Sequence, residues 1–336
     1  MINRSFTFIA MSLVTVAALP AVAQDLTPVT FGTNWVAQAE HGGYYQAVAD
    51  GTYAACGLDV KILPGGPQVN NRALMLAGQV DFHMDGSSLD TISAAQEGLP
   101  IVAVAATFQK DPQVILTHPG AASSFADLVK LDKLLISDGG VLTFWAFMQK
   151  AYGFKPEQRE VYTFNAAPLI ANATWGMQGY LTSEPFFVEK EAGFKPDVYL
   201  IADAGYNAYS TIIATMADTI ATRPEVVQCF VDGSAKGWYT FLYGDNAAAI
   251  ALIKADNAEM SDEAIAFSIA KMVEYGIVDS GDAETLGIGA MTEERMAAFY
   301  ASMVDSGVVP AGIDYSGAYT LAFVNKGVGL DLRPAQ

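Results

Sequence analysis

The chain has 336 residues, of which 52% are hydrophobic and 16% are charged. This composition excludes an intrinsically disordered protein, and the length suits one large domain or two smaller ones. The 36 acidic residues outnumber the 18 basic ones, so a net charge of −18 argues against nucleic-acid and anionic membrane partners. Two cysteines and three histidines offer little for a zinc cluster, and we expect neither a metal nor a cofactor.

The first 23 residues have the pattern of a secretory signal peptide. Arg4 is the only charged residue before Asp25, residues 6–19 are largely apolar, and Ala21-Val22-Ala23 supplies a small-x-small cleavage site. An uncleaved membrane anchor is the alternative, and the short apolar stretch argues against it. We therefore expect cleavage before Gln24 and an exported, periplasmic protein.

Export would place Cys56 and Cys229 in an oxidising compartment, where an even number of cysteines usually forms disulfides. Two separate buried thiols are the alternative. The sequence does not give the distance between the two side chains, so it leaves both outcomes open.

The mature chain first alternates predicted strands and helices. The strand over residues 58–62 alternates apolar and polar residues, whereas residues 101–108 are almost continuously apolar, as expected of a strand buried on both faces. Such strand–helix units are typical of a mostly parallel sheet covered by helices. The predicted strands are 29–32, 58–62, 80–84, 101–108, 133–137, 161–164, 179–182, 198–202 and 211–215, and the predicted helices are 43–50, 68–77, 89–97, 142–152 and 168–176.

From Pro224 onward the pattern becomes helical, with one long amphipathic helix and further helices over 247–255, 262–275 and 292–306. The simplest arrangement is an α/β protein of two lobes. We expect lobe I to comprise residues 24–117 and 210–336, with the helical part packed on it, and lobe II to comprise residues 118–209. The chain would cross between the lobes near Thr117 and near Tyr209.

Aromatic residues gather just beyond the carboxyl ends of the predicted strands, the edge where open α/β sheets bind ligands. Aromatic faces with a few polar groups describe a small-molecule cleft. The same segments carry Glu40, Asp85 and Glu184 but no arginine, which favours a neutral or cationic heterocycle over an anion. The chain contains none of the common catalytic motifs, so we expect a binding protein rather than an enzyme. The aromatic residues are Trp35, Tyr44, Tyr45, Phe144, Trp145, Tyr180, Phe186, Phe187, Tyr206 and Tyr209.

Six sequence strings together resemble a family of periplasmic substrate-binding proteins that serve ABC importers for sulfonates, taurine, riboflavin and pyrimidine precursors of thiamine. The resemblance implies a type II periplasmic-binding-protein fold, with two crossovers and a ligand cleft between the lobes, shared with the fungal thiamine-pyrimidine synthases. It also implies a monomer that closes on its ligand and delivers it to a permease in the inner membrane. The strings are Asn34-Trp35 with Glu40-His41-Gly42-Gly43-Tyr44-Tyr45, Gly57-Leu58-Asp59-Val60, Ala77-Gly78-Gln79-Val80-Asp81-Phe82, Thr182-Ser183-Glu184-Pro185-Phe186, Asp203-Ala204-Gly205-Tyr206 and Ile288-Gly289-Ala290-Met291-Thr292.

The pyrimidine-precursor branch resembles this chain most, and it implies a ligand stacked on Trp35 or Trp145 with an exocyclic amine donating to Glu184. Two alternatives stay open. A sulfonate or taurine binder of the same family would need the arginines that these segments lack, and a secreted enzyme on the same fold would use Glu40 with His41 or His83. The fungal synthases need a cysteine-rich iron-binding motif, which this chain does not have. The expected ligand-binding residues are Asn34, Trp35, Glu40, His41, Tyr45, Asp85, Trp145, Glu184, Phe186 and Tyr206.

Overall fold

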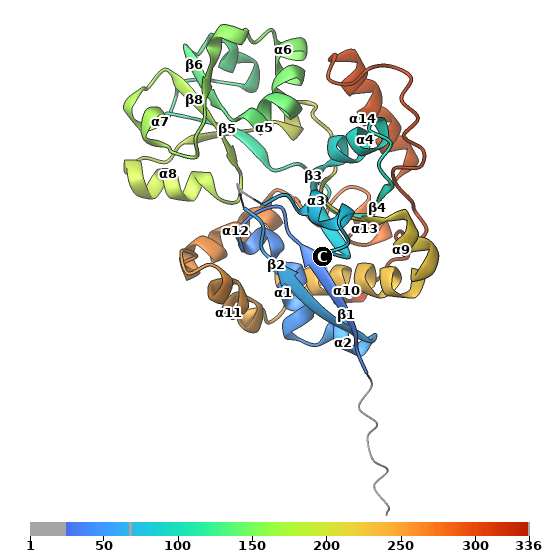
Figure 1. Cartoon of the computed structure of the whole chain (residues 1–336). Coiled ribbons are helices and arrows are strands. Elements are labelled where there is room, and N and C mark those ends of the chain that lie inside the picture. Colours follow the sequence, from blue (N-terminus) through green and yellow to red (C-terminus); the bar gives the residue numbers. More distant parts are fainter. Residues whose placement is uncertain (1–24, 67–68, 335–336) are drawn as a thin grey trace, which may run out of the picture.

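A computed structural model describes residues 25–66 and 69–334 of the chain. The predicted signal peptide and its cleavage site before Gln24 lie outside the described residues. Within the described ranges, no helix combines the length and the apolar composition needed to cross a membrane. The described chain forms two α/β lobes, with the green elements of lobe II above the blue and orange elements of lobe I (Figure 1).

Each lobe contains one five-stranded sheet, and the two sheets share one topology. The fourth strand in each order is antiparallel to its neighbours, and the first three are parallel to one another. In lobe I the order is β2-β1-β3-β10-β4, with β1 Thr27–Gly32, β2 Leu58–Leu63, β3 Phe82–Ser87, β4 Ile101–Phe108 and β10 Ser210–Met216. In lobe II the order is β7-β6-β8-β5-β9, with β5 Gln113–Thr117, β6 Lys133–Ile136, β7 Arg159–Val161, β8 Trp175–Tyr180 and β9 Asp197–Leu200.

The antiparallel strands β5 and β10 are the first strands that the chain forms after each crossing between lobes. The first crossing occupies residues 109–112 and the second residues 201–209. The first crossing was expected near Thr117, in mostly parallel sheets, and β5 was not expected. Only four residues separate β5 from β4, so nothing in the two apolar runs indicated that they lie in different sheets.

Helices cover both sheets, and most lie close to their predicted positions. A predicted helix over 168–176 is shorter in the structure, because the Asn172 side chain donates to the carbonyl of Pro168 at 2.7 Å, and β8 starts at Trp175. The helices are α1 Gly42–Ala49, α2 Thr52–Ala55, α3 Asn71–Leu76, α4 Ser88–Gln96, α5 Asp138–Gly140, α6 Ala146–Tyr152, α7 Ala167–Ala171, α8 Glu184–Ala192, α9 Ala217–Thr222, α10 Pro224–Tyr243, α11 Ala247–Asp256, α12 Asp262–Glu274, α13 Ala283–Leu286 and α14 Glu293–Asp305.

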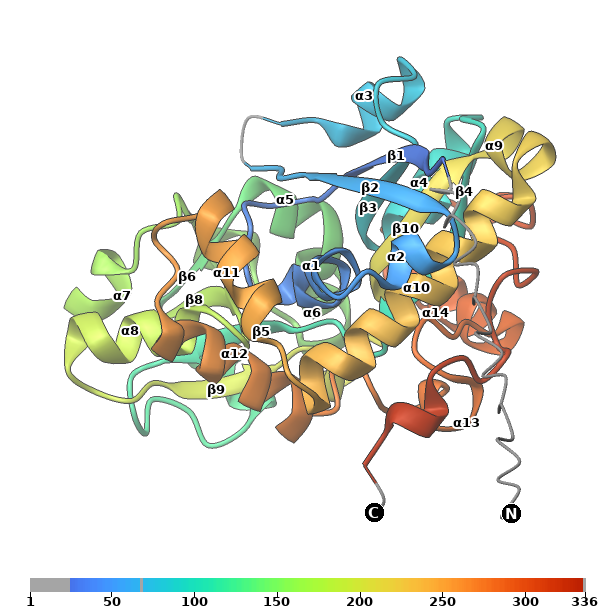
Figure 2. The same cartoon turned by 90° about the horizontal axis from the view of Figure 1, so that it is seen from below.

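The long helix α10 packs against α1 in the core of lobe I (Figure 2). Glycines allow this close approach: a Cβ atom on Gly43 would lie 2.2 Å from the Trp238 ring, and one on Gly237 would lie 2.1 Å from the carbonyl of Gly43. Gly43 and Gly237 therefore let α1 lie directly against α10, which positions the segment that leads from β1 to α1.

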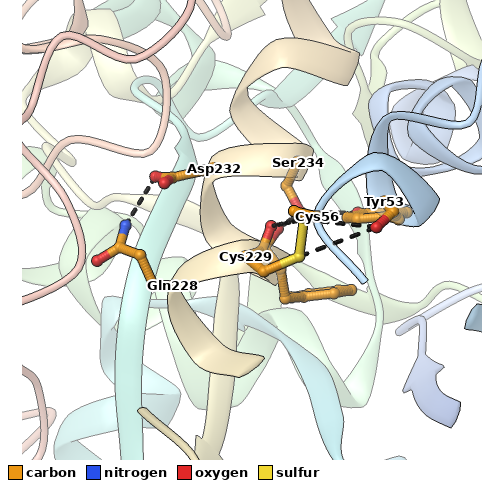
Figure 3. The surroundings of a disulfide bond; sticks show 7 residues. Tyr53, Cys56, Gln228, Cys229, Asp232 and Ser234 are labelled. Carbon is orange, nitrogen blue, oxygen red and sulfur yellow. Dashed lines mark hydrogen bonds between the residues drawn. A yellow bond between two sulfur atoms is a disulfide. The ribbon is translucent and has the colours of Figure 1, made fainter. Parts of the chain in front are cut away.

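A disulfide joins Cys56, after α2, to Cys229 on α10 (Figure 3). The Cα atoms are 5.9 Å apart, within the range of ordinary disulfides. Beside it, the hydroxyl groups of Tyr53 and Ser234 form a buried hydrogen bond of 2.8 Å. Of the two outcomes that the sequence left open, the structure has the bridge.

Candidate functional site

A cavity of about 310 Å³ lies between the lobes. Its wall is formed by the segments that follow β1, β6 and β7, by β3 and the start of α4, by β8 and the start of α8, and by both crossings with the first residues of β5 and β10. This is the strand-end location at which open α/β sheets bind ligands. The cavity size is at the lower end of the range for small-molecule sites.

The structure brings six of the expected side chains together on this wall from three separate stretches of the chain. They come from the β1–α1 segment, the start of α8 and the second crossing. These residues are Asn34, Trp35, Glu40, His41, Glu184 and Tyr206.

Four other expected residues lie away from the cavity wall. The Tyr45 hydroxyl donates to Asp256 at 2.7 Å in the packing of α1 against α11, and Asp85 is paired with Arg72 at 3.0 Å. Phe186 packs on Phe267 of α12, with ring centroids 5.5 Å apart.

Trp145 is buried in the core of lobe II, whereas its neighbour Phe144 lines the cavity. Residues Val141–Trp145 form a π-helical turn between α5 and α6. Such a turn shifts the phase of a helix, so ordinary helical spacing did not reveal which of the two rings faces the ligand space.

Aromatic rings from both lobes meet at the cavity. The ring centroids of Trp35 of lobe I and Phe164 of lobe II lie 5.2 Å apart, and those of Tyr162 and Phe164 are also 5.2 Å apart. Phe164 has a φ of 60° and is 56% exposed. A bulky residue in the left-handed region is uncommon and marks local strain, which is often found at ligand clamps.

The charged part of the wall is entirely acidic among the described residues. Glu40, Asp90, Asp111 and Glu184 line the cavity, and no lysine or arginine among those residues does. Burial raises the pKa of Glu40 and that of Asp111 to about 7, and burial also raises the pKa of Glu184. The site is therefore prepared for hydrogen-bond donors or positive charge.

Glu40 has one satisfied and one unsatisfied oxygen. The Thr182 hydroxyl of lobe II donates to Oε1, while Oε2 is buried without a partner among the described residues. Burial lowers the pKa of the neighbouring His41 to about 3, so that imidazole is neutral. With a proton on Nε2 it donates to the Asn34 side chain at 3.2 Å and leaves Nδ1 as a buried acceptor.

Lobe II contributes an ordered polar group to the wall. The Gln178 side-chain oxygen accepts a hydrogen bond from the backbone of Ser137 at 2.6 Å, and the Ser137 hydroxyl accepts one from Gly140 at 3.0 Å. The Ser137 hydroxyl thus already occupies the N–H of Gly140 in the helical turn α5.

Sequence reasoning missed Gln178, Asp111, Thr182 and Phe164. Gln178 is only 7% exposed in β8, and a polar residue within an apolar strand was the signal that could have found it. Asp111 belongs to the first crossing, which was expected further along the chain, near Thr117.

The alternative enzymatic site would use Glu40 with His41 or His83, and in the described residues only Glu40 and His41 line the cavity. No hydrogen bond joins Glu40 to His41, and His83 lies 2.9 Å from Asp85, which is away from the cavity wall. The described residues also contain no cluster of three or more histidine, cysteine or carboxylate side chains able to hold a metal ion.

Known proteins with this architecture are similar over most of the chain. Residues 38–278 match the family described as NMT1/THI5 like. Riboflavin-binding protein RibY from Chloroflexus aurantiacus is 24% identical over 337 residues, which cover 93% of this chain and 90% of that protein.

Two solved structures show how widely the fold is used. The periplasmic aliphatic sulphonate binding protein SsuA from Escherichia coli has a TM-score of 0.59 at 15% identity, covering 87% of this chain and 91% of its own. The desulfurization enzyme DSZB has a TM-score of 0.51 at 13% identity, and the match covers 91% of this chain and 99% of the DSZB chain. The expected periplasmic-binding-protein fold is thus confirmed. Because the family match spans more than half of its residues, the chain belongs to the NMT1/THI5-like family.

Proposed function

We propose that the protein is the extracytoplasmic solute-binding component of an ABC importer, and that it binds a small nitrogen heterocycle rich in N–H donors, such as a pyrimidine precursor of thiamine. The observation that carries this proposal is an aromatic, acidic cavity between two lobes, in which no described lining residue is a lysine or arginine. The similarity to a riboflavin-binding protein supports a heterocyclic ligand.

The wall suggests how such a ligand would bind. Trp35 and Phe164 offer aromatic faces for stacking, and the carboxyl groups of Glu40 and Glu184 offer acceptors to amino or ring N–H groups. Gln178, held by Ser137 through its oxygen, would present its NH₂ group to a ring nitrogen or carbonyl. The cavity of about 310 Å³ suits a ligand of one or two rings better than a larger one.

Closure of the lobes on the ligand, periplasmic location, action as a monomer and delivery to an inner-membrane permease belong to the same proposal. They rest on the two-lobe fold with its two crossings, on similarity to proteins described as periplasmic or import components, and on the signal-peptide pattern.

A sulfonate ligand is the second candidate, because SsuA shares the fold. A sulfonate would face four carboxyl groups and no lining lysine or arginine among the described residues. Buried anions usually need an arginine fork or several aimed N–H donors. The cavity therefore favours the heterocycle.

The first experiment is native mass spectrometry of freshly purified, undialysed mature protein, followed by release and mass identification of whatever is bound. A thermal-shift panel of pyrimidines, flavins, amines and sulfonates then tests ligands directly, because binding to the folded state raises its apparent stability. Selective stabilisation by sulfonates, or by no heterocycle, would contradict the proposal. A bound compound recovered chemically changed would favour an enzyme, a class that DSZB shows on this fold.

Two carboxyl variants test the assigned site. Glu184→Gln is expected to weaken heterocycle binding more than Asp85→Asn, since Glu184 lines the cavity while Asp85 is paired with Arg72 and His83 away from it. Equal affinities of the two variants, measured by isothermal titration calorimetry, would remove Glu184 from its role.

A further inference from the structure

A buried chain of hydrogen bonds crosses between the lobes beside the cavity. The Thr182 hydroxyl, from lobe II, donates to Glu40 Oε1 of lobe I. The carbonyl of the same threonine accepts a hydrogen bond from the Ser268 hydroxyl on α12 at 2.6 Å. Glu40, Thr182 and Ser268 are 5%, 0% and 2% exposed, so water does not compete for these bonds. These hydrogen bonds hold the Glu40 carboxyl group in place and occupy one of its two oxygens.

The second oxygen, Glu40 Oε2, is buried and has no hydrogen-bond partner among the described residues. An ionised carboxylate in this position is costly, because burial without donors removes its solvation. A proton on the carboxyl group removes that cost, and so does a ligand that donates to Oε2. Glu40 itself lines the cavity, so a ligand there comes next to the group.

The groups around Glu40 do not supply a positive charge. Glu184 on α8 acts on it electrostatically and favours its neutral form, and burial raises the pKa of Tyr180 on β8, so that phenol is neutral. His41, next to it in the 3₁₀ turn Ala39–His41, is neutral because burial lowers its pKa to about 3. The only contribution from α12 in the hydrogen bonds described above is the Ser268 hydroxyl, which reaches Glu40 indirectly, through Thr182.

We propose that ligand binding is coupled to the release of a proton from Glu40. The carboxyl group is protonated in the ligand-free protein; when a ligand N–H donates to Oε2, the carboxyl O–H bond breaks and the proton passes to the buffer, with no covalent change in the ligand. This inference rests on the proposed function, because it needs a ligand with N–H donors.

The size of the effect follows from the pKa of Glu40, which burial raises to about 7. At pH 6.5 about three quarters of these groups are protonated, so binding is expected to release about three quarters of a proton. Affinity is then constant above pH 8 and falls as pH decreases, by about 10-fold at pH 6 and about 100-fold at pH 5.

The test is isothermal titration calorimetry at pH 6.5 in phosphate and in Bis-Tris, two buffers whose ionisation enthalpies differ. The probes are 4-amino-5-hydroxymethyl-2-methylpyrimidine and riboflavin. The difference in binding heat between the buffers counts the protons released. Because an aminopyrimidine ring can itself be protonated, the readout is the difference between the wild type and Glu40→Gln.

Asp111→Asn is the comparison variant, since burial also raises the pKa of Asp111 to about 7 and this residue also lines the cavity. Both variants can change the affinity, so proton release is expressed per ligand bound: it should disappear in Glu40→Gln and persist in Asp111→Asn. The reverse result, or binding by the wild type without proton release, would overturn the inference while leaving the proposed function intact.

A second measurement needs no ligand. A ¹³C NMR titration of the glutamate side chains, with Glu40 identified as the signal missing from Glu40→Gln, should show this carboxyl group titrating near pH 7. A Glu40 signal that titrates near its ordinary value of 4.5 would refute proton coupling whatever binds. Failure of both probes, and of the wider panel, to bind would instead overturn the proposed function.

Discussion

Replacing Glu40 by glutamine is expected to stabilise the ligand-free protein at neutral and alkaline pH but not at pH 4. Burial raises the pKa of Glu40 from 4.5 to about 7. Between these values the folded state binds more protons than the unfolded state, so the free energy of unfolding falls as pH rises through this window. Glutamine retains the shape and the acceptor for Thr182 and does not titrate.

The magnitude follows from the shift. Each pKa unit is worth about 1.4 kcal/mol, so a shift of about 2.5 units corresponds to about 3 kcal/mol at pH 8. At pH 4 the carboxyl group is largely protonated in both states, and the contribution is small. Any fixed cost of the amide group is the same at both values of pH, so it cancels in the comparison.

The assay is urea unfolding of dialysed wild type and Glu40→Gln at pH 4 and pH 8, followed by tryptophan fluorescence. The stability difference between the two proteins should grow by about 3 kcal/mol in favour of the variant from pH 4 to pH 8. Glu189→Gln, on the exposed side of α8, serves as the control and should show no such change. If the difference in free energy of unfolding between the wild type and Glu40→Gln is the same at both pH values, the argument that burial holds Glu40 neutral is refuted.

Removal of the disulfide, by replacing both Cys56 and Cys229 with alanine, should lower the free energy of unfolding by up to about 5 kcal/mol, since the bridge closes a separation of 173 residues; an unchanged urea midpoint would contradict this. Gly43→Ala should destabilise lobe I by about 1–3 kcal/mol, because its Cβ would overlap the neighbouring indole, while Gly317→Ala, with nothing within 4 Å, should stay within about 0.5 kcal/mol of the wild type in the same assay. Phe164→Ala removes the aromatic contact between the lobes and should raise the ligand dissociation rate about 2- to 10-fold in stopped-flow fluorescence; an unaltered rate would remove Phe164 from the site.

The sequence by itself determined the features that depend on local pattern and composition. Ile101–Phe108 is a strand with the predicted bounds, because a continuous apolar run needs no distant partner to be recognised. The two α/β lobes, the helical C-terminal part and the acidic, aromatic character of the strand-end segments follow from the same kind of evidence. Trp35, Glu40 and Glu184, which line the cavity, were expected in this way, since each lies just beyond a strand end or at the start of a helix.

Only the tertiary structure decided which residues meet. Whether β5 belongs to the first or the second sheet depends on the path of the chain through residues 109–112, and local pattern does not encode that path. The choice between Phe144 and Trp145 as the cavity ring depends on a π-helical turn that shifts the helix phase. The unpartnered oxygen of Glu40 exists because Thr182, from the other lobe, occupies only one of its two oxygens. A pKa set by burial and by contacts between segments so distant in the chain is a property of the folded site, and the identity of the residue alone does not determine it.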